Sequence, residues 1–244
     1  MATGNALLDE LPEGERVLLL PYLRPVEVER GVLLMEAGAA IESVEFPVTM
    51  VASLLSQTRE GDPIEVAMIG PEGILGAWAA SGIDLAPWTA TAQLGGESLR
   101  LGVQEFRQAL VDAPVLRDRV QRYGLTQTFM MSQSILCNRF HDLPQRAARW
   151  LLIFASKATA SAGPLPVTQE MLSHMLGVHR PSVTLALQTL ADAGLIRSEG
   201  RGLIAITDRP GLEVMACECF QQVQTFNASV TGQGSGRFGP AGED

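Results

Sequence analysis

The sequence predicts a mixed α+β fold, with an antiparallel β domain first, a long helix next and a helical domain with one β-hairpin last. Between about residues 21 and 106, short apolar runs alternate with Gly, Pro or charged residues, as in an antiparallel sandwich or roll. From 104 to 138 the apolar residues recur with a helical period instead. After residue 140, further helical segments precede a strand–turn–strand pattern that ends near Ile206.

The N-terminal part is expected to begin with an amphipathic helix over residues 1–20 and to continue as six strands. The strands are predicted at Val32–Met35, Ser43–Pro47, Met50–Leu55, Ile64–Ile69, Thr89–Leu94 and Ser98–Leu101. Turns between them are expected at Gly31, Gly38, Gly61, Gly70 and Gly73.

The apolar stripe over 104–138 is the expected dimer contact. A long helix between two domains usually buries such a stripe against a partner, so we expect a homodimer, with packing inside the same chain as the alternative. Pro114 is expected to interrupt this helix or to start a new one. The stripe comprises Leu110, Leu116, Val120, Tyr123, Leu125, Phe129 and Ile135. Another helix is expected over 142–157.

Composition narrows the class of protein. With 244 residues, 46% of them hydrophobic, the chain is long enough to form a substantial core. No apolar run reaches the roughly 18 residues that span a bilayer, and the acidic N-terminus lacks the basic region of a signal peptide. We therefore expect a cytoplasmic protein without a membrane partner. Three cysteines do not make a disulfide framework, which fits a reducing compartment.

The net charge of −9 is unevenly distributed along the chain. Residues 139–213 hold eight Arg or Lys and six Asp or Glu, which gives a net charge of +2. The remaining residues hold 10 basic and 21 acidic side chains, which gives −11. Because salt screens charges beyond about 8–10 Å, the local charge decides whether a polyanion can bind.

Residues 167–184 predict a helix-turn-helix. Thr168 can cap a short helix, Leu172 and Leu176 lie one turn apart, and Gly177 supplies the backbone freedom that the turn requires. The second helix is expected to start at His179 or Arg180, with Pro181 in its first turn. Such a pair of helices places the second one in the major groove of DNA.

The expected DNA contacts lie on this second helix and on the hairpin after it. Arg180, Thr184 and Gln188 recur at i, i+4 and i+8, where arginine can bond guanine, threonine can touch a thymine methyl, and glutamine can read adenine or contact phosphate. Ordinary solvated positions are the alternative. Residues 194–206 predict a wing whose tip suits phosphate contact. The complete expected set is Thr168, Gln169, His179, Arg180, Ser182, Thr184, Gln188, Arg197, Ser198 and Arg201.

Two motifs resemble the Crp/Fnr family of bacterial transcription regulators: Leu-Gly-Val-His-Arg-Pro-Ser-Val-Thr at 176–184 and Leu-Ala-Asp-Ala-Gly-Leu-Ile at 190–196. The resemblance covers about residues 15–225. It implies a cyclic-nucleotide-binding-like β-roll as sensor (1–110), a dimerisation helix and hinge (111–140) and a winged helix-turn-helix (141–225). It also implies a homodimer on double-stranded DNA, with RNA polymerase as a further partner. The low-complexity residues 226–244 are expected to be disordered.

The chain departs from the family's pattern at the DNA-reading helix. Arg180 aligns with the family's guanine-reading arginine, but Pro181 stands where well-known members have glutamate, and Leu185 occupies another commonly basic position. We therefore expect a different base preference.

The sensor departs further. Ala77 replaces the glutamate of cyclic-AMP binders, and Leu85–Thr89 has no basic residue to pair with the cyclic phosphate. Since a buried phosphodiester needs a positive partner, control by cyclic AMP in the usual way is not expected, and the effector is either an unknown small molecule or absent. The expected effector pocket comprises Gly76, Ala77, Trp78, Trp88 and Thr89, and its tryptophans either fill it or stack on a flat ligand.

No cofactor, metal or catalytic centre is expected. There is no cysteine before Cys137 for an iron–sulfur cluster of the family's oxygen sensors, and no histidine before His141 for a haem in the sensor. No constellation of catalytic residues is apparent, so an enzyme is not expected.

The cysteines are expected to serve packing. On a helix, Cys217 and Cys219 would point about 200° apart and could not easily share a metal, with a redox switch or a metal site as the alternatives. Cys137 is expected to pack a helix, and His141 to lie at the hinge.

A second hypothesis for the whole chain is a ligand-binding or scaffold module. Its helix-turn-helix would contact a protein instead of DNA, because the net charge of that domain is only +2.

Overall fold

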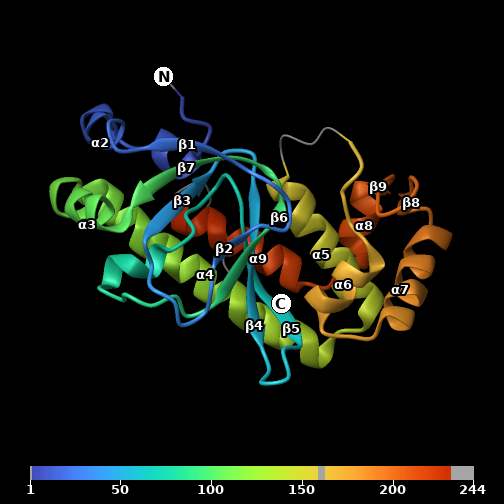
Figure 1. Cartoon of the computed structure of the whole chain (residues 1–244). Coiled ribbons are helices and arrows are strands. Elements are labelled where there is room, and N and C mark those ends of the chain that lie inside the picture. Colours follow the sequence, from blue (N-terminus) through green and yellow to red (C-terminus); the bar gives the residue numbers. More distant parts are fainter. Residues whose placement is uncertain (1, 159–162, 232–244) are drawn as a thin grey trace. The chain divides into compact units, whose positions relative to one another are not determined.

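The structure, a computed structural model, describes residues 2–158 and 163–231 (Figure 1). It consists of two compact units. The first contains the chain up to Gly124 together with Ser156–Ala158, and the second contains Leu125–Ala155 and the chain from Gly163 onward. The fold is of the mixed α+β class, as the sequence predicts, whereas the bounds of the four predicted segments stay a prediction.

The N-terminal residues form two short helices, α1 (Ala6–Asp9) and α2 (Glu13–Leu19), so the single helix expected over 1–20 is wrong. Pro12 separates them because it has an extended backbone (φ −53°, ψ 142°) that cannot continue α1. Of the apolar positions expected on the buried side of the single helix, Leu7, Leu8 and Leu11 are buried, whereas Val17 and Leu18 are 54% and 48% exposed.

Seven strands build two antiparallel sheets in the first unit, one of order β1-β7-β3 and one of order β2-β6-β4-β5. Their bounds are β1 Arg24–Val28, β2 Leu33–Met35, β3 Ser43–Pro47, β4 Val51–Gln57, β5 Pro63–Ile69, β6 Thr89–Leu94 and β7 Gly96–Gly102. Six coincide with the predicted strands to within a few residues. The sequence misses β1, an edge strand with mostly exposed side chains, because it lacks the apolar run on which the prediction depends.

The core of the first unit lies along β3, β4 and β5. All five residues from Val51 to Leu55 in β4 are buried. This explains why its apolar residues do not alternate regularly with polar ones. Glu45 is also buried; its carboxylate forms an ion pair with Arg100 (2.5 Å) and accepts a hydrogen bond from Ser98 Oγ (2.9 Å). A buried charge of this kind needs both partners.

Two helices, α3 (Val103–Asp112) and α4 (Pro114–Phe140), follow the strands. Pro114 therefore starts a new helix, as predicted. The apolar stripe of α4 divides into two sets. Leu116, Val120 and Tyr123 are buried within the chain, so the alternative of intramolecular packing is correct for them. Leu125 and Ile135 are instead 61% and 73% exposed.

The second unit contains five further helices and a two-stranded sheet. They are α5 Leu143–Lys157 (which ends in the first unit), α6 Gln169–Leu176, α7 Arg180–Asp192, β8 Ile196–Ser198, β9 Ile204–Ile206, α8 Arg209–Met215 and α9 Cys219–Thr231. Residues 226–231, expected to be disordered, belong to α9; residues 232–244 lie outside the described part. Cys217 precedes α9, so the premise that Cys217 and Cys219 share a helix is wrong.

Within residues 2–158 and 163–231, no helix combines the length and the apolar character that crossing a membrane requires.

The turn between α6 and α7 provides a stability test. Gly177 has φ +61°, a left-handed conformation that costs other L-residues about 1–2 kcal/mol. Gly177→Ala is therefore expected to lower the free energy of unfolding by about 1–2 kcal/mol, measured by urea denaturation of the second unit's helical signal. The control is Gly124→Ala within α4, where a Cβ meets nothing within 4 Å; it should stabilise by about 0.5–1 kcal/mol. Equal effects of the two substitutions would contradict the assigned turn.

Candidate nucleic-acid interface

The helix-turn-helix is formed by α6 and α7, as predicted. Thr168 caps α6, and its hydroxyl accepts a hydrogen bond from the backbone N–H of Met171 (3.1 Å). Leu172 and Leu176 are buried, which fixes the inner side of α6. Gly177 ends the helix, and the N–H of Val178 donates to the carbonyl of Ser173 (3.0 Å) across the turn.

The second helix, α7, presents a clear division between its two sides. His179 is the residue before its first turn, and Pro181 lies in that turn, where no N–H is needed. The buried side consists of Val183, Ala186, Leu187 and Leu190. The opposite side is exposed and consists of Arg180, Ser182, Thr184, Leu185 and Gln188.

The hydrogen bonds of this exposed side distinguish Arg180 from Thr184 and Gln188. Thr184 Oγ1 donates to Gln169 Oε1 (3.0 Å), which joins α7 to α6, and Gln188 Nε2 donates to Asp192 Oδ1 (2.7 Å). The guanidinium of Arg180 has neither a hydrogen bond nor an ion pair with the residues that the structure describes. With no acidic side chain in the first turn of α7, this end of the helix is positive. Arg180 is therefore the side chain most available to an acceptor such as guanine.

The wing is the hairpin of β8 and β9. Gly200 and Gly202, both with positive φ, form its tip, and the N–H of Glu199 donates to the carbonyl of Leu203 (3.0 Å). Arg197 forms an ion pair with Glu199, so its charge is partly neutralised. Arg201 is exposed and has no such partner in the described ranges. Of the two wing arginines, Arg201 is the one free to contact phosphate.

The remaining predicted contacts also lie on these elements. Thr168, His179 and Ser182 are exposed beside the two helices, and Gln169 is half-buried. Ser198 is exposed on the wing, where its hydroxyl donates to the carbonyl of Gly200 (3.3 Å). The ten predicted positions thus occur on the helix-turn-helix and its wing; their contact with DNA stays a prediction.

The sequence did not predict one residue that stabilises the helix-turn-helix. The guanidinium of Arg146 on α5 donates to the carbonyl of Leu176 at the end of α6 and to Asn138 Oδ1 on α4 (2.8 Å). It therefore satisfies a helix end and joins three helices of the second unit. Only the tertiary fold brings these segments together, so no local sequence signal indicates this role.

The predicted effector residues lie around a short 3₁₀ helix, Ala77–Ser81, in the first unit. Gly76 precedes it with φ +92°, and Ala77 is buried. Trp78 and Trp88 pack edge to face with ring centroids 5.3 Å apart, and Thr89 begins β6. The two tryptophan rings thus contact each other, and the role of these residues as an effector pocket stays a prediction.

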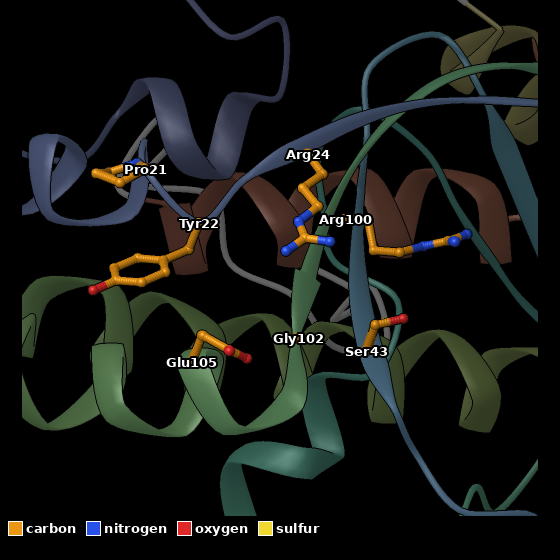
Figure 2. Close-up of a pocket in the computed structure, with 7 residues that line it drawn as sticks. All are labelled: Pro21, Tyr22, Arg24, Ser43, Arg100, Gly102 and Glu105. Atoms are coloured by element: carbon orange, nitrogen blue, oxygen red, sulfur yellow. The ribbon is translucent and has the colours of Figure 1, made fainter.

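A cavity of about 230 Å³ opens elsewhere on the same unit. Figure 2 shows the seven residues that line it: Pro21, Tyr22, Arg24, Ser43, Arg100, Gly102 and Glu105. None of them belongs to the predicted effector set. Arg24 extends over the middle of the cavity, whereas Arg100 extends away from Arg24 (Figure 2) and is held by Glu45.

Comparison with known proteins identifies similar chains. Residues 145–215 match the family model of the Crp-like helix-turn-helix domain. A CRP-like cAMP-activated global transcriptional regulator of Mycobacterium tuberculosis (strain CDC 1551 / Oshkosh) is 24% identical over 193 residues, which cover 76% of this chain and 85% of the relative. The matched domain contains α6, α7 and the wing, which places the interface described above within it.

Solved structures support the same fold. FixK2 of Bradyrhizobium japonicum superposes with a TM-score of 0.69 at 16% identity, covering 80% of this chain and 98% of the other. The c-di-GMP-responsive global regulator CLP of Xanthomonas campestris gives 0.66 at 15% identity, covering 80% and 99%. At such identities these likenesses concern the fold alone.

Proposed function

This chain belongs to the Crp/Fnr family of transcription regulators, and on that premise we propose that it binds a two-fold symmetric DNA operator as a homodimer. The observation that carries the proposal is the exposed guanidinium of Arg180 at the first turn of α7, which has no hydrogen bond or ion pair within residues 2–158 and 163–231. Arg201 on the wing supplies a phosphate contact beside it. The other predicted positions, above all Thr184 and Gln188, complete the surface after exchanging their present hydrogen bonds for bonds to DNA.

The exposed side of α4 supports the dimer. Leu125 and Ile135 lie ten residues apart, which places them about 80° apart around a helix of 3.6 residues per turn, the spacing of an a and a d position of a coiled coil. Phe140 at the end of α4 is 73% exposed as well. Apolar side chains that lie on one exposed side of a long helix favour burial against a second copy. Two α7 helices held in this way read half-sites about one helical turn apart.

The cellular location and the partners that we propose follow from this function. A protein that regulates transcription acts on DNA in the cytoplasm, needs no catalytic centre of its own, and meets RNA polymerase when it activates a promoter. We therefore propose a cytoplasmic regulator that is not an enzyme. Pro181 and Leu185 on the exposed side of α7 support an operator sequence that differs from those of the best-known relatives.

Control by an effector other than cyclic AMP is the second part of the proposal. Ala77 offers no carboxylate for a ribose, and Leu85–Thr89 offers no cation for a cyclic phosphate. The contact between Trp78 and Trp88 occupies the same region. An anionic ligand placed there would lose its hydration without gaining an ion pair.

Calorimetric titration of cyclic AMP into the full chain is therefore expected to show no stoichiometric binding in the micromolar range. The absence of a positive partner for the phosphate is the physical reason. A one-to-one isotherm with a micromolar dissociation constant would contradict this prediction, and a verified cyclic-AMP receptor measured in the same buffer serves as the control.

A mobility-shift assay tests the DNA-binding proposal. The full chain is titrated onto its own promoter region and onto a scrambled duplex of equal length, at several salt concentrations and with candidate effectors. We expect selective binding that weakens steeply as salt rises, because phosphate contacts release counterions. No selective binding under any of these conditions would contradict the proposal and favour the protein-binding hypothesis. Genome-wide mapping of bound sites then gives the operator.

A further inference from the structure

Four potential metal ligands from separate segments meet in the second unit. Cys137 belongs to the last turn of α4, His141 follows that helix, Cys217 precedes α9 and Cys219 is its first residue. Their ligand atoms all lie within 4.8 Å of one another. The three cysteines are buried, and Cys137 and Cys217 are 80 residues apart in the sequence. The fold thus assembles a Cys₃His set that no local motif predicts.

Two of the distances within this set match those between neighbouring ligands of one tetrahedral ion. The sulfur atoms of Cys137 and Cys217 are 3.5 Å apart, and Cys219 Sγ lies 3.6 Å from His141 Nδ1. Around a tetrahedral Zn²⁺ with Zn–S of about 2.3 Å and Zn–N of about 2.0–2.1 Å, neighbouring ligand atoms are separated by about 3.5–3.8 Å. An iron–sulfur cluster distributes its ligands over several iron ions and therefore needs wider spacing.

The histidine is oriented as a metal ligand usually is. Its Nδ1 faces Cys219, while its Nε2 lies 3.1 Å from Glu218 Oε1. A carboxylate that accepts the second ring N–H fixes the tautomer that leaves the first nitrogen free to bind a metal. Glu218 thus acts as a positioning residue, and its exposed side chain is supplied by the same turn that carries Cys217 and Cys219.

Two arginines of α5, Arg146 and Arg149, lie near the set. Arg149 is buried, and its Nε has no hydrogen-bond partner in the described part of the chain. Three thiolates and one divalent cation give a net charge of −1, which these two arginines can balance.

We propose that Cys137, His141, Cys217 and Cys219 bind a single structural Zn²⁺ ion. The soft thiolates and the imidazole select zinc over the hard cations, and four protein ligands leave no open position for a substrate. The ion fastens the end of α4 to the turn before α9, both within the second unit. This replaces the expectation of packing cysteines, which depended on placing Cys217 and Cys219 on one helix.

The first test uses the full wild-type chain without an affinity tag. Elemental analysis is expected to find one zinc per chain, and X-ray absorption at the zinc edge is expected to find three sulfur atoms and one nitrogen. After chelation under reducing conditions, Co²⁺ should restore one equivalent of metal and give the visible absorption of tetrahedral cobalt thiolate. Absence of metal, an iron centre in place of zinc, or a disulfide between Cys137 and Cys217 would each overturn the proposal.

Variants then test the individual ligands. Cys217→Ser and His141→Gln are expected to lose stoichiometric zinc, and Glu218→Gln to weaken zinc affinity about tenfold through the freed imidazole. His174→Gln, an exposed histidine of α6, is the matched control and should keep one zinc per chain. Retention of full zinc affinity by His141→Gln would overturn the ligand assignment. If a variant does not fold, the metal analysis of the wild-type chain still tests the proposal.

Discussion

Replacing Leu125 and Ile135 together by glutamate is expected to make the chain monomeric and to weaken operator binding on the order of 10³-fold. Both residues are more than half exposed on α4, although Leu116, Val120 and Tyr123 of the same stripe are buried. Charges at the centre of a self-complementary helix contact would face the same charges on the second copy. A monomer then keeps one half-site and about half of the contacts to DNA.

Light scattering combined with gel filtration measures the oligomeric state, and a mobility-shift titration measures the affinity. The matched control replaces Val111 and Val214 by glutamate, because these valines are 69% and 88% exposed and lie outside α4. The control should stay dimeric and keep its affinity. A dimer formed by the Leu125→Glu, Ile135→Glu variant would show that another surface joins the two copies.

Arg180→Ala is expected to reduce specific DNA binding by about 1–3 kcal/mol, which is roughly 5- to 150-fold, and to relax the base preference at one position of each half-site. The guanidinium of Arg180 on the exposed face of α7 has no hydrogen bond or ion pair with the described residues. A bidentate bond to guanine would therefore be gained without breaking an existing one. Gln188 is held by Asp192, so its removal should have a smaller effect.

Selection from a randomised operator library, together with affinity measurements, checks this prediction. Arg201→Ala on the wing provides a contrast, since losing a phosphate contact weakens all sequences alike and reduces the salt slope by about 1. Arg209→Ala is the control outside the interface, because that arginine pairs with Glu213 on α8. Unchanged affinity and preference in Arg180→Ala would show that α7 does not read the operator.

The sequence alone was sufficient wherever structure depends on neighbouring residues. Apolar periodicity predicts the strands of the β domain, and proline geometry predicts the new helix that begins at Pro114. Backbone freedom at Gly177 predicts the turn between the two helices on either side of it. Each of these effects acts within a few residues. The same local rules missed β1, because an edge strand is held by its neighbour β7 rather than by an apolar run of its own. They also merged α1 and α2, since Pro12 separates two helices whose residues would otherwise suit one.

Tertiary structure alone decided three features of the molecule. They are which residues of the α4 stripe are buried, which partners the interface side chains have, and which residues form the Cys₃His set. Periodicity marks Val120 and Ile135 as equally apolar, but only packing buries the first and exposes the second. Cys137 and Cys217 are remote in sequence and meet because α4 and the turn before α9 pack together. Distances between such segments depend on how whole elements pack, and a local pattern of residues carries no information about that packing.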